Sequence, residues 1–311
     1  MNTVGITALV PPELIFACRM SPCDINNSVP KAGLRPASKL CAWTAVWRDM
    51  ILARQLEIDR LVVVAGGDCH NALVDGQKVE YSGVPTHYFF YPFEEDYSFL
   101  CEQLEKLSSF LGGIEDPSMF DAVARLKERT LDIDRKRKEG DISAINAFEI
   151  MVAASDMKGD LNKFEDMVDN VKEEPVEYKA RIALLGVPPI HYDFHKILKS
   201  LGLHVVYDEL PYEFTRLTGR NMDELAKNYL NYTFARKLSF RLDFLEKELK
   251  RRNVDGVIHY TQFACHHLLE DDMMRKRLDY PWLVIQGDMP HRTPSQVKTR
   301  LEAFAEMLQK W

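Results

Sequence analysis

The stretch from Arg60 to Cys69, RLVVVAGGDC, decides the fold class of this chain. Its first six residues form a short apolar run rich in β-branched side chains, which is typical of a strand buried inside a parallel sheet. Gly66-Gly67 closes the strand, so that Cys69 follows directly after a turn. A helical pattern with one broad apolar face precedes this stretch, over residues 41–58. A buried strand preceded by a helix indicates an α/β fold.

The same alternation continues on both sides of this stretch. In the first half, residues 86–91 predict a second strand, and a helix over residues 96–111 ends at Gly112-Gly113. The second half repeats the pattern, with strands predicted at 181–186, 203–207, 256–260 and 282–285 and helical stretches at 191–200, 222–252, 265–278 and 294–309. Alternating strands and helices predict parallel sheets with helices on both faces.

The middle of the chain has a different pattern. Residues 116–173 show no convincing strand and are amphipathic and charged, and the mixed charges of DIDRKRKEGD are typical of a solvated helix face. We therefore expect a first α/β lobe over residues 1–115, a connecting helical region over 116–175 and a second α/β lobe over 176–311. Each lobe is predicted to contain a Rossmann-like or flavodoxin-like parallel sheet.

Composition excludes several classes of protein. The 311 residues include 40 basic and 47 acidic side chains, for a net charge of −7, which is not the electrostatic footprint of a duplex-binding protein. No stretch approaches the ~20 apolar residues of a membrane span. Pro11, Pro12 and Glu13 interrupt the apolar start, and no basic region precedes it, so we predict no signal peptide. We expect a cytoplasmic protein that binds neither nucleic acid nor membranes, and whose six cysteines form no structural disulfides.

Three cysteines share one position in the predicted topology. Cys69 and Cys265 each follow a predicted strand, and Cys41 begins the helix that leads to the first of these strands. Ligands of α/β folds bind beyond the carboxyl ends of the strands, and a helix N-terminus favours a thiolate. Three converging thiolates would suit an iron–sulfur cluster with one iron lacking a protein ligand. The alternative is that these cysteines are small buried hydrophobes, because no C-x-x-C is present, and this alternative is favoured for Cys18, Cys23 and Cys101.

Other polar residues could take part in chemistry. His70 and His266, with His267 beside it, could assist proton transfer or hydrogen-bond a cluster sulfur, or could simply be solvated. Glu13 is either an acid stabilised at a helix start or a general base facing the cleft. The sequence contains no recognisable P-loop, and no G-x-G-x-x-G fingerprint follows a strand, so a dinucleotide cofactor is not indicated.

Four motifs of the chain also occur in a known family: VPPELI with the following PCDINN, Leu40-Cys41, GGDC at 66–69, and DGVIHYTQFAC at 255–265 with its extension over 279–308. On these motifs the chain resembles the catalytic-component family of 2-hydroxyacyl-CoA dehydratases, which includes benzoyl-CoA reductase subunits and double-cubane cluster proteins. The family's cluster cysteines fall on Cys41, Cys69 and Cys265, and a family carboxylate near the substrate falls on Glu13.

The resemblance implies a function. It implies an iron–sulfur (4Fe-4S) catalytic subunit, a lyase or ATP-dependent reductase, that acts on an acyl-CoA and pairs with a related or identical subunit in a dimer. A separate ATP-hydrolysing iron–sulfur activator protein would supply the electron. Two alternatives stay open, namely a homodimeric reductase of small molecules with a double-cubane (8Fe-9S) cluster and a non-enzymatic cluster-binding accessory protein.

Overall fold

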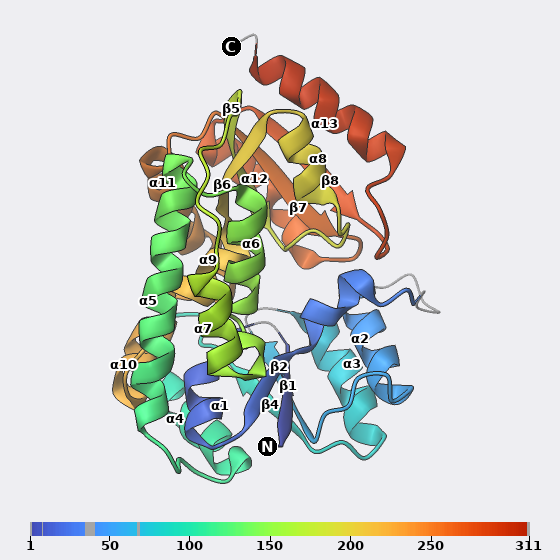
Figure 1. Cartoon of the computed structure of the whole chain (residues 1–311). Coiled ribbons are helices and arrows are strands. Elements are labelled where there is room, and N and C mark those ends of the chain that lie inside the picture. Colours follow the sequence, from blue (N-terminus) through green and yellow to red (C-terminus); the bar gives the residue numbers. More distant parts are fainter. Residues whose placement is uncertain (1, 8, 35–40, 67–68, 310–311) are drawn as a thin grey trace.

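Two four-stranded, all-parallel sheets form the framework of the chain in the computed structural model, which describes residues 2–7, 9–34, 41–66 and 69–309 (Figure 1). The first sheet has the order β2-β1-β3-β4, from strands β1 (Thr3–Ile6), β2 (Ser21–Asp24), β3 (Arg60–Gly66) and β4 (Thr86–Phe90). The second has the order β6-β5-β7-β8, from β5 (Ala180–Gly186), β6 (Leu203–Asp208), β7 (Gly256–Gln262) and β8 (Trp282–Gly287). The predicted α/β class with two parallel-sheet lobes is confirmed.

Helices cover both faces of the first sheet. Successive side chains of a strand point to opposite faces, and in β3 Leu61 and Val63 pack into one core while Val62 and Val64 pack into another. The helical elements of this lobe are α1 (Pro12–Ala17), η1 (Ile25–Lys31), α2 (Ala42–Leu52), α3 (His70–Tyr81) and α4 (Tyr97–Leu111). Helix α2 ends earlier than the pattern over 41–58 predicts.

The connecting segment is helical, as predicted. It consists of α5 (Ser118–Glu139), α6 (Ala144–Ala153), η2 (Met157–Gly159) and α7 (Leu161–Asp169). Helix α5 runs alongside both lobes (Figure 1). Its Phe120 lies in a core of the first lobe, whereas its Asp134 forms a buried salt bridge, 2.6 Å long, with Arg252 of the second.

The second lobe repeats the layered arrangement. Ile182 and Leu184 of β5 pack into one core, and Ala183 and Leu185 pack into the other. Its helical elements are α8 (Phe194–Ser200), α9 (Glu209–Arg216), α11 (Leu238–Arg251), η4 (His266–Glu270), α12 (Asp271–Leu278) and α13 (Ser295–Leu308). Between α9 and α11 the chain forms α10 (Met222–Tyr229) and η3 (Thr233–Ala235), which pack into the core that contains residues of the first lobe. No helix of the described residues is both long and apolar enough to cross a bilayer.

The prediction of a single helical stretch over residues 222–252 is wrong. The chain leaves the helix after Tyr229 and begins α11 only at Leu238. Between them, Tyr232 and Phe234 are buried in a core with residues of the first lobe. Burial of these two aromatic side chains outweighs the local preference for a continuous helix, because helix propensity is a weak term compared with tertiary packing.

Candidate functional site

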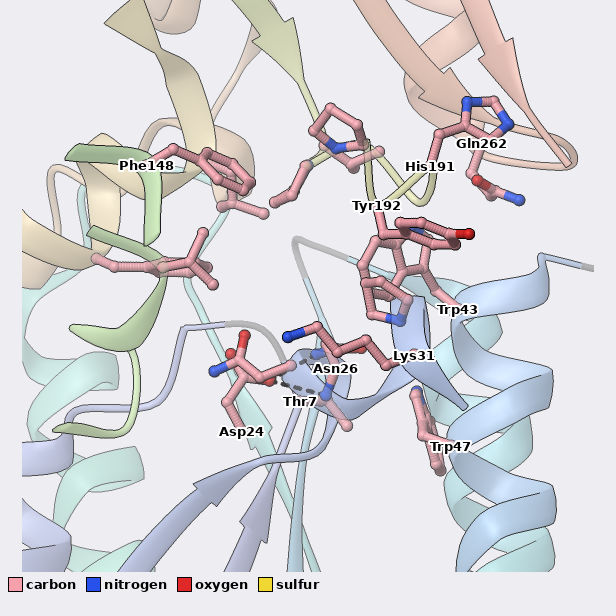
Figure 2. Close-up of a pocket in the computed structure, with 18 of the residues that line it drawn as sticks. Thr7, Asp24, Asn26, Lys31, Trp43, Trp47, Phe148, His191, Tyr192 and Gln262 are labelled. Carbon is pink, nitrogen blue, oxygen red and sulfur yellow. Dashed lines mark hydrogen bonds between the residues drawn. The ribbon is translucent and has the colours of Figure 1, made fainter. Parts of the chain in front are cut away.

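One cavity lies at the carboxyl ends of both sheets. In each sheet the strand order reverses between two inner strands, β1 and β3 in the first and β5 and β7 in the second. Such a switch point is where open α/β sheets bind ligands. Residues after all four strands, such as Thr7 after β1 and Pro188 after β5, line a shared cavity of about 440 Å³. Figure 2 shows Thr7 of the first lobe, Gln262 of the second and Phe148 of α6 around this space.

Cys41, Cys69 and Cys265 all line this cavity. Cys41 is the N-cap residue of α2, Cys69 is the N-cap residue of α3, and Cys265 directly precedes η4. Cys69 and Cys265 also occupy equivalent positions in the two lobes. Cys69 follows β3 and Cys265 follows β7, and each of these strands is third in the order of its sheet. The structure therefore brings the three predicted cysteines to one site from three separate segments.

Backbone amides surround two of the thiols. The Ala72 N–H donates a hydrogen bond to Cys69 Sγ at 3.4 Å. Burial raises the pKa of the Cys41 thiol to about 12, against the effect of the amides of Thr44 and Trp43, and a charge on Cys265 raises it further. The Cys41 thiol therefore carries its proton at neutral pH unless a cation replaces that proton.

No group of three or more His, Cys, Asp and Glu side chains among the described residues is arranged to hold a single metal ion. A single ion needs all its ligands within bonding distance of one point. The cysteines of an iron–sulfur cluster bind different irons, so they need not converge so closely. Three thiols that line one cavity fit the donor set of a cluster, and that fit is independent of whether a single-ion site is present.

The predicted histidines lie close to Cys265. His266 lines the cavity, and burial, with a smaller contribution from His267, lowers its pKa to about 4, so the ring is neutral at pH 7. The ring centres of His266 and His70 are 6.1 Å apart. His70 is exposed at the start of α3 and is not one of the described residues that line the cavity. His267 Nδ1 lies 3.0 Å from Glu270 Oε2.

Glu13 lies in the first turn of α1 and is fully buried. Its Oε1 forms a salt bridge with Lys127 Nζ at 3.0 Å, and its Oε2 accepts a hydrogen bond from the Tyr229 hydroxyl at 3.0 Å. The structure does not bring Glu13 to the described lining of the cavity. A role for Glu13 as a general base stays a prediction.

The family comparison covers the whole site. A family described as 2-hydroxyglutaryl-CoA dehydratase, D-component, matches residues 7–308. The chain belongs to this D-component family. The matched range includes every strand except β1, the connecting helices and all three cysteines, so the family resemblance seen in the sequence is confirmed. No curated protein sequence matches the chain.

This D-component family member also carries site residues that sequence reasoning missed. His195 of α8 lines the cavity, and its Nε2 lies 2.9 Å from Oδ1 of Asp208, which ends β6. The signal that could have revealed this pair was an acid at the carboxyl end of a predicted strand. Three lysines also line the cavity with exposed side chains, namely Lys31, Lys158 and Lys196.

Proposed function

We propose that this dehydratase-type component is the iron–sulfur catalytic subunit of a 2-hydroxyacyl-CoA dehydratase, a lyase, with a 4Fe-4S cluster on Cys41, Cys69 and Cys265. Membership of the D-component family supports this proposal. The observation that carries it is that three cysteines from three separate helix starts line one cavity at the switch points of both sheets.

The cysteines would supply three thiolate ligands. A bound cluster would supply an open iron as Lewis acid together with a low-potential electron. The Ala72 amide donates to Cys69 Sγ, and such hydrogen bonds to sulfur tune the reduction potential of a cluster. The neutral His266 ring adds no positive charge beside Cys265. One of its ring nitrogens can donate a hydrogen bond and the other can accept one. Of the predicted catalytic residues, His266 lines the cavity, and catalytic roles for His70 and Glu13 stay predictions.

The cavity has features that suit an acyl-CoA. Its volume of about 440 Å³ lies within the range of small-molecule sites. Lys31, Lys158 and Lys196 are exposed along its lining and would attract the phosphates of coenzyme A. His195, oriented by Asp208, could hold the proton that a departing hydroxyl group needs.

Two protein partners belong to the proposal. Reduction of a thioester needs a potential near the lower limit known for iron–sulfur centres, ~−700 mV. The sequence has no P-loop to couple ATP hydrolysis to that reduction. A cytoplasmic ATP-hydrolysing iron–sulfur activator would therefore deliver the electron, and a related or identical subunit would complete a dimer.

ATP dependence tests this function. The anaerobically purified chain, with its partner subunit, is mixed with the activator, a reductant and a 2-hydroxyacyl-CoA, and formation of the enoyl-CoA is followed by mass spectrometry. We expect product only when ATP is present and hydrolysed, so a non-hydrolysable ATP analogue is the matched control. Turnover with a mild electron donor and no ATP would contradict the proposal.

A further inference from the structure

Helix α6 is apolar on two faces. Ala147, Ile150 and Met151 are buried against the protein interior. Ile145, Phe148 and Val152 lie three and four residues apart on another face, are only partly buried and line the cavity. An apolar face of a helix is normally covered by packing. The face formed by Ile145, Phe148 and Val152, here called the outer face of α6, lacks such cover.

Apolar residues from other elements share this part of the lining. Leu210 and Phe214 of α9 line the same cavity, as does Pro188 in the segment after β5. The Phe148 ring also packs on the His195 ring, with 4.0 Å between their centres. Figure 2 shows Phe148 directed into the cavity from α6. The cavity therefore has a largely apolar wall beside the His195–Asp208 pair.

The lysines of the lining lie outside α6, with Lys31 in η1, Lys158 in η2 and Lys196 in α8. Helix α6 itself adds one charge to the lining, the exposed carboxylate of Glu149. A cavity with exposed cations and a separate apolar wall is complementary to an anionic molecule that carries an apolar group. A carboxylate placed on the outer face of α6 would lose its hydration there and would lie beside the like charge of Glu149, and both effects are costly.

We propose that the outer face of α6 binds the acyl side chain of the thioester substrate, so that the chain selects 2-hydroxyacyl-CoA substrates with an uncharged, apolar acyl group over those with a second carboxylate. This inference rests on the proposed function, because it takes the cavity to be the acyl-CoA site. Phe148 is the central residue of the face and determines specificity through contact with the acyl chain.

Binding of unreactive CoA esters tests the inference without turnover. Isothermal titration calorimetry on the full-length, anaerobically purified protein compares hexanoyl-CoA, adipoyl-CoA and free coenzyme A. The two esters have acyl chains of equal carbon number and differ by the terminal carboxylate of adipoyl-CoA. We expect hexanoyl-CoA to bind about tenfold more tightly than adipoyl-CoA.

Variants at Phe148 test whether the outer face of α6 is the surface that binds the acyl chain. Phe148→Ala should weaken hexanoyl-CoA binding about tenfold and leave the affinity for free coenzyme A unchanged, and Phe148→Leu should restore most of the loss. Tyr81→Ala is the matched control, because this aromatic residue is 96% exposed and lies outside the described cavity lining. If Phe148→Ala does not fold, Phe148→Leu and the wild-type comparison of the two esters decide.

The outcomes separate this inference from the proposed function. Adipoyl-CoA binding as tightly as hexanoyl-CoA would overturn the apolar acyl site but leave a CoA thioester as the substrate. Equal loss of affinity for coenzyme A and hexanoyl-CoA in Phe148→Ala would also overturn it. Failure of all three probes to bind would overturn both the inference and the acyl-CoA function.

Discussion

Glu13 and Lys127 form an ion pair in which both side chains are fully buried. Lys127 Nζ also donates to the Leu217 carbonyl and to the Tyr229 hydroxyl, so it ties α1 and α5 to the segment around α10. Removal of one partner from such a pair leaves an uncompensated charge in the interior. The contacts of Glu13 therefore indicate a structural role even if it also takes part in catalysis.

Lys127→Met should lower the free energy of unfolding by about 3 kcal/mol, because Glu13 would keep a buried charge without its partner. Urea denaturation followed by circular dichroism measures this change. The double variant Lys127→Met/Glu13→Leu is the control and should recover most of the loss, since it removes both charges. Equal stability of the wild type and Lys127→Met would contradict this account.

Asp24 shows how burial changes the protonation of a single carboxyl group. Its Oδ1 accepts a hydrogen bond from the Asn26 N–H at 3.0 Å, and its own N–H donates to Asp156 Oδ2 at 2.8 Å. Burial and then the charge of Asp156 raise the pKa of Asp24 from its ordinary 3.8 to about 7, although the hydrogen bonds from Ser155 and Asn26 oppose the shift. The pKa of Asp156 is raised for the same first reason, burial.

A raised pKa in the folded state means that the folded chain binds more protons than the unfolded chain between about pH 4 and pH 7. The contribution of Asp24 to the free energy of unfolding therefore falls as the pH rises through this window. Asp24→Asn should reduce that fall, and asparagine keeps the side-chain oxygen that caps η1. Urea unfolding at several pH values measures the difference, and parallel pH profiles of wild type and variant would show the assignment to be incorrect.

At the scale of elements, α3 holds Cys69 at its start and packs closely on β3 through Gly76. A Cβ atom at Gly76 would lie 2.6 Å from Cγ2 of Val63, and the short valine side chain has no room to move away. Gly76→Val should therefore cost about 1–3 kcal/mol of stability through overpacking. Val74→Ala on the same helix is the control, because Val74 is 51% exposed, and it should change stability little. Chemical denaturation of the two variants distinguishes them, and unchanged stability of Gly76→Val would refute this packing argument.

The elements that sequence predicts best are those with strong local patterns. The apolar run in Arg60–Gly66 forms β3, and Gly112, with φ of 102°, ends α4 as predicted. Strands β1 and β2 have four residues each and were not predicted, because TVGI is too short for a clear pattern and SPCD contains a proline. Helix α9 was missed because its sequence, ELPYEFTR, contains Pro211, which the first turn of a helix tolerates.

Some features of the candidate site could likewise be predicted from the sequence, and others could not. The position of Cys69 and Cys265 after strands, and of Cys41 at a helix start, follows from local sequence and parallel topology. The pairing of His195 with Asp208 depends on how α8 packs against β6, and the outer face of α6 depends on how the connecting helices lie between the lobes. Sequence spacing carries neither piece of information, since both are set by long-range packing.

At the scale of the whole molecule, the cavity is shared by both lobes and the connecting helices. Helix α5 fixes this arrangement through buried charges, with Lys127 paired to Glu13 of the first lobe and Asp134 paired to Arg252 of the second. The Asn71 side chain also donates to the Ala264 carbonyl at 3.1 Å, next to Cys69 and Cys265. The relative position of the three cysteines therefore depends on both lobes together, and neither lobe alone determines it.

Cys41, Cys69 and Cys265 are proposed to hold an iron–sulfur cluster. The most direct measurement is the iron and acid-labile sulfide content of the full-length chain after anaerobic purification, for the wild type and for Cys41→Ser, Cys69→Ser and Cys265→Ser. Cys101→Ser is the matched control, because Cys101 lies within α4 and outside the described cavity lining. We predict about four irons per wild-type chain, loss of most of the iron in each of the three variants, and full retention in Cys101→Ser. Equal iron in Cys265→Ser and Cys101→Ser would contradict the account.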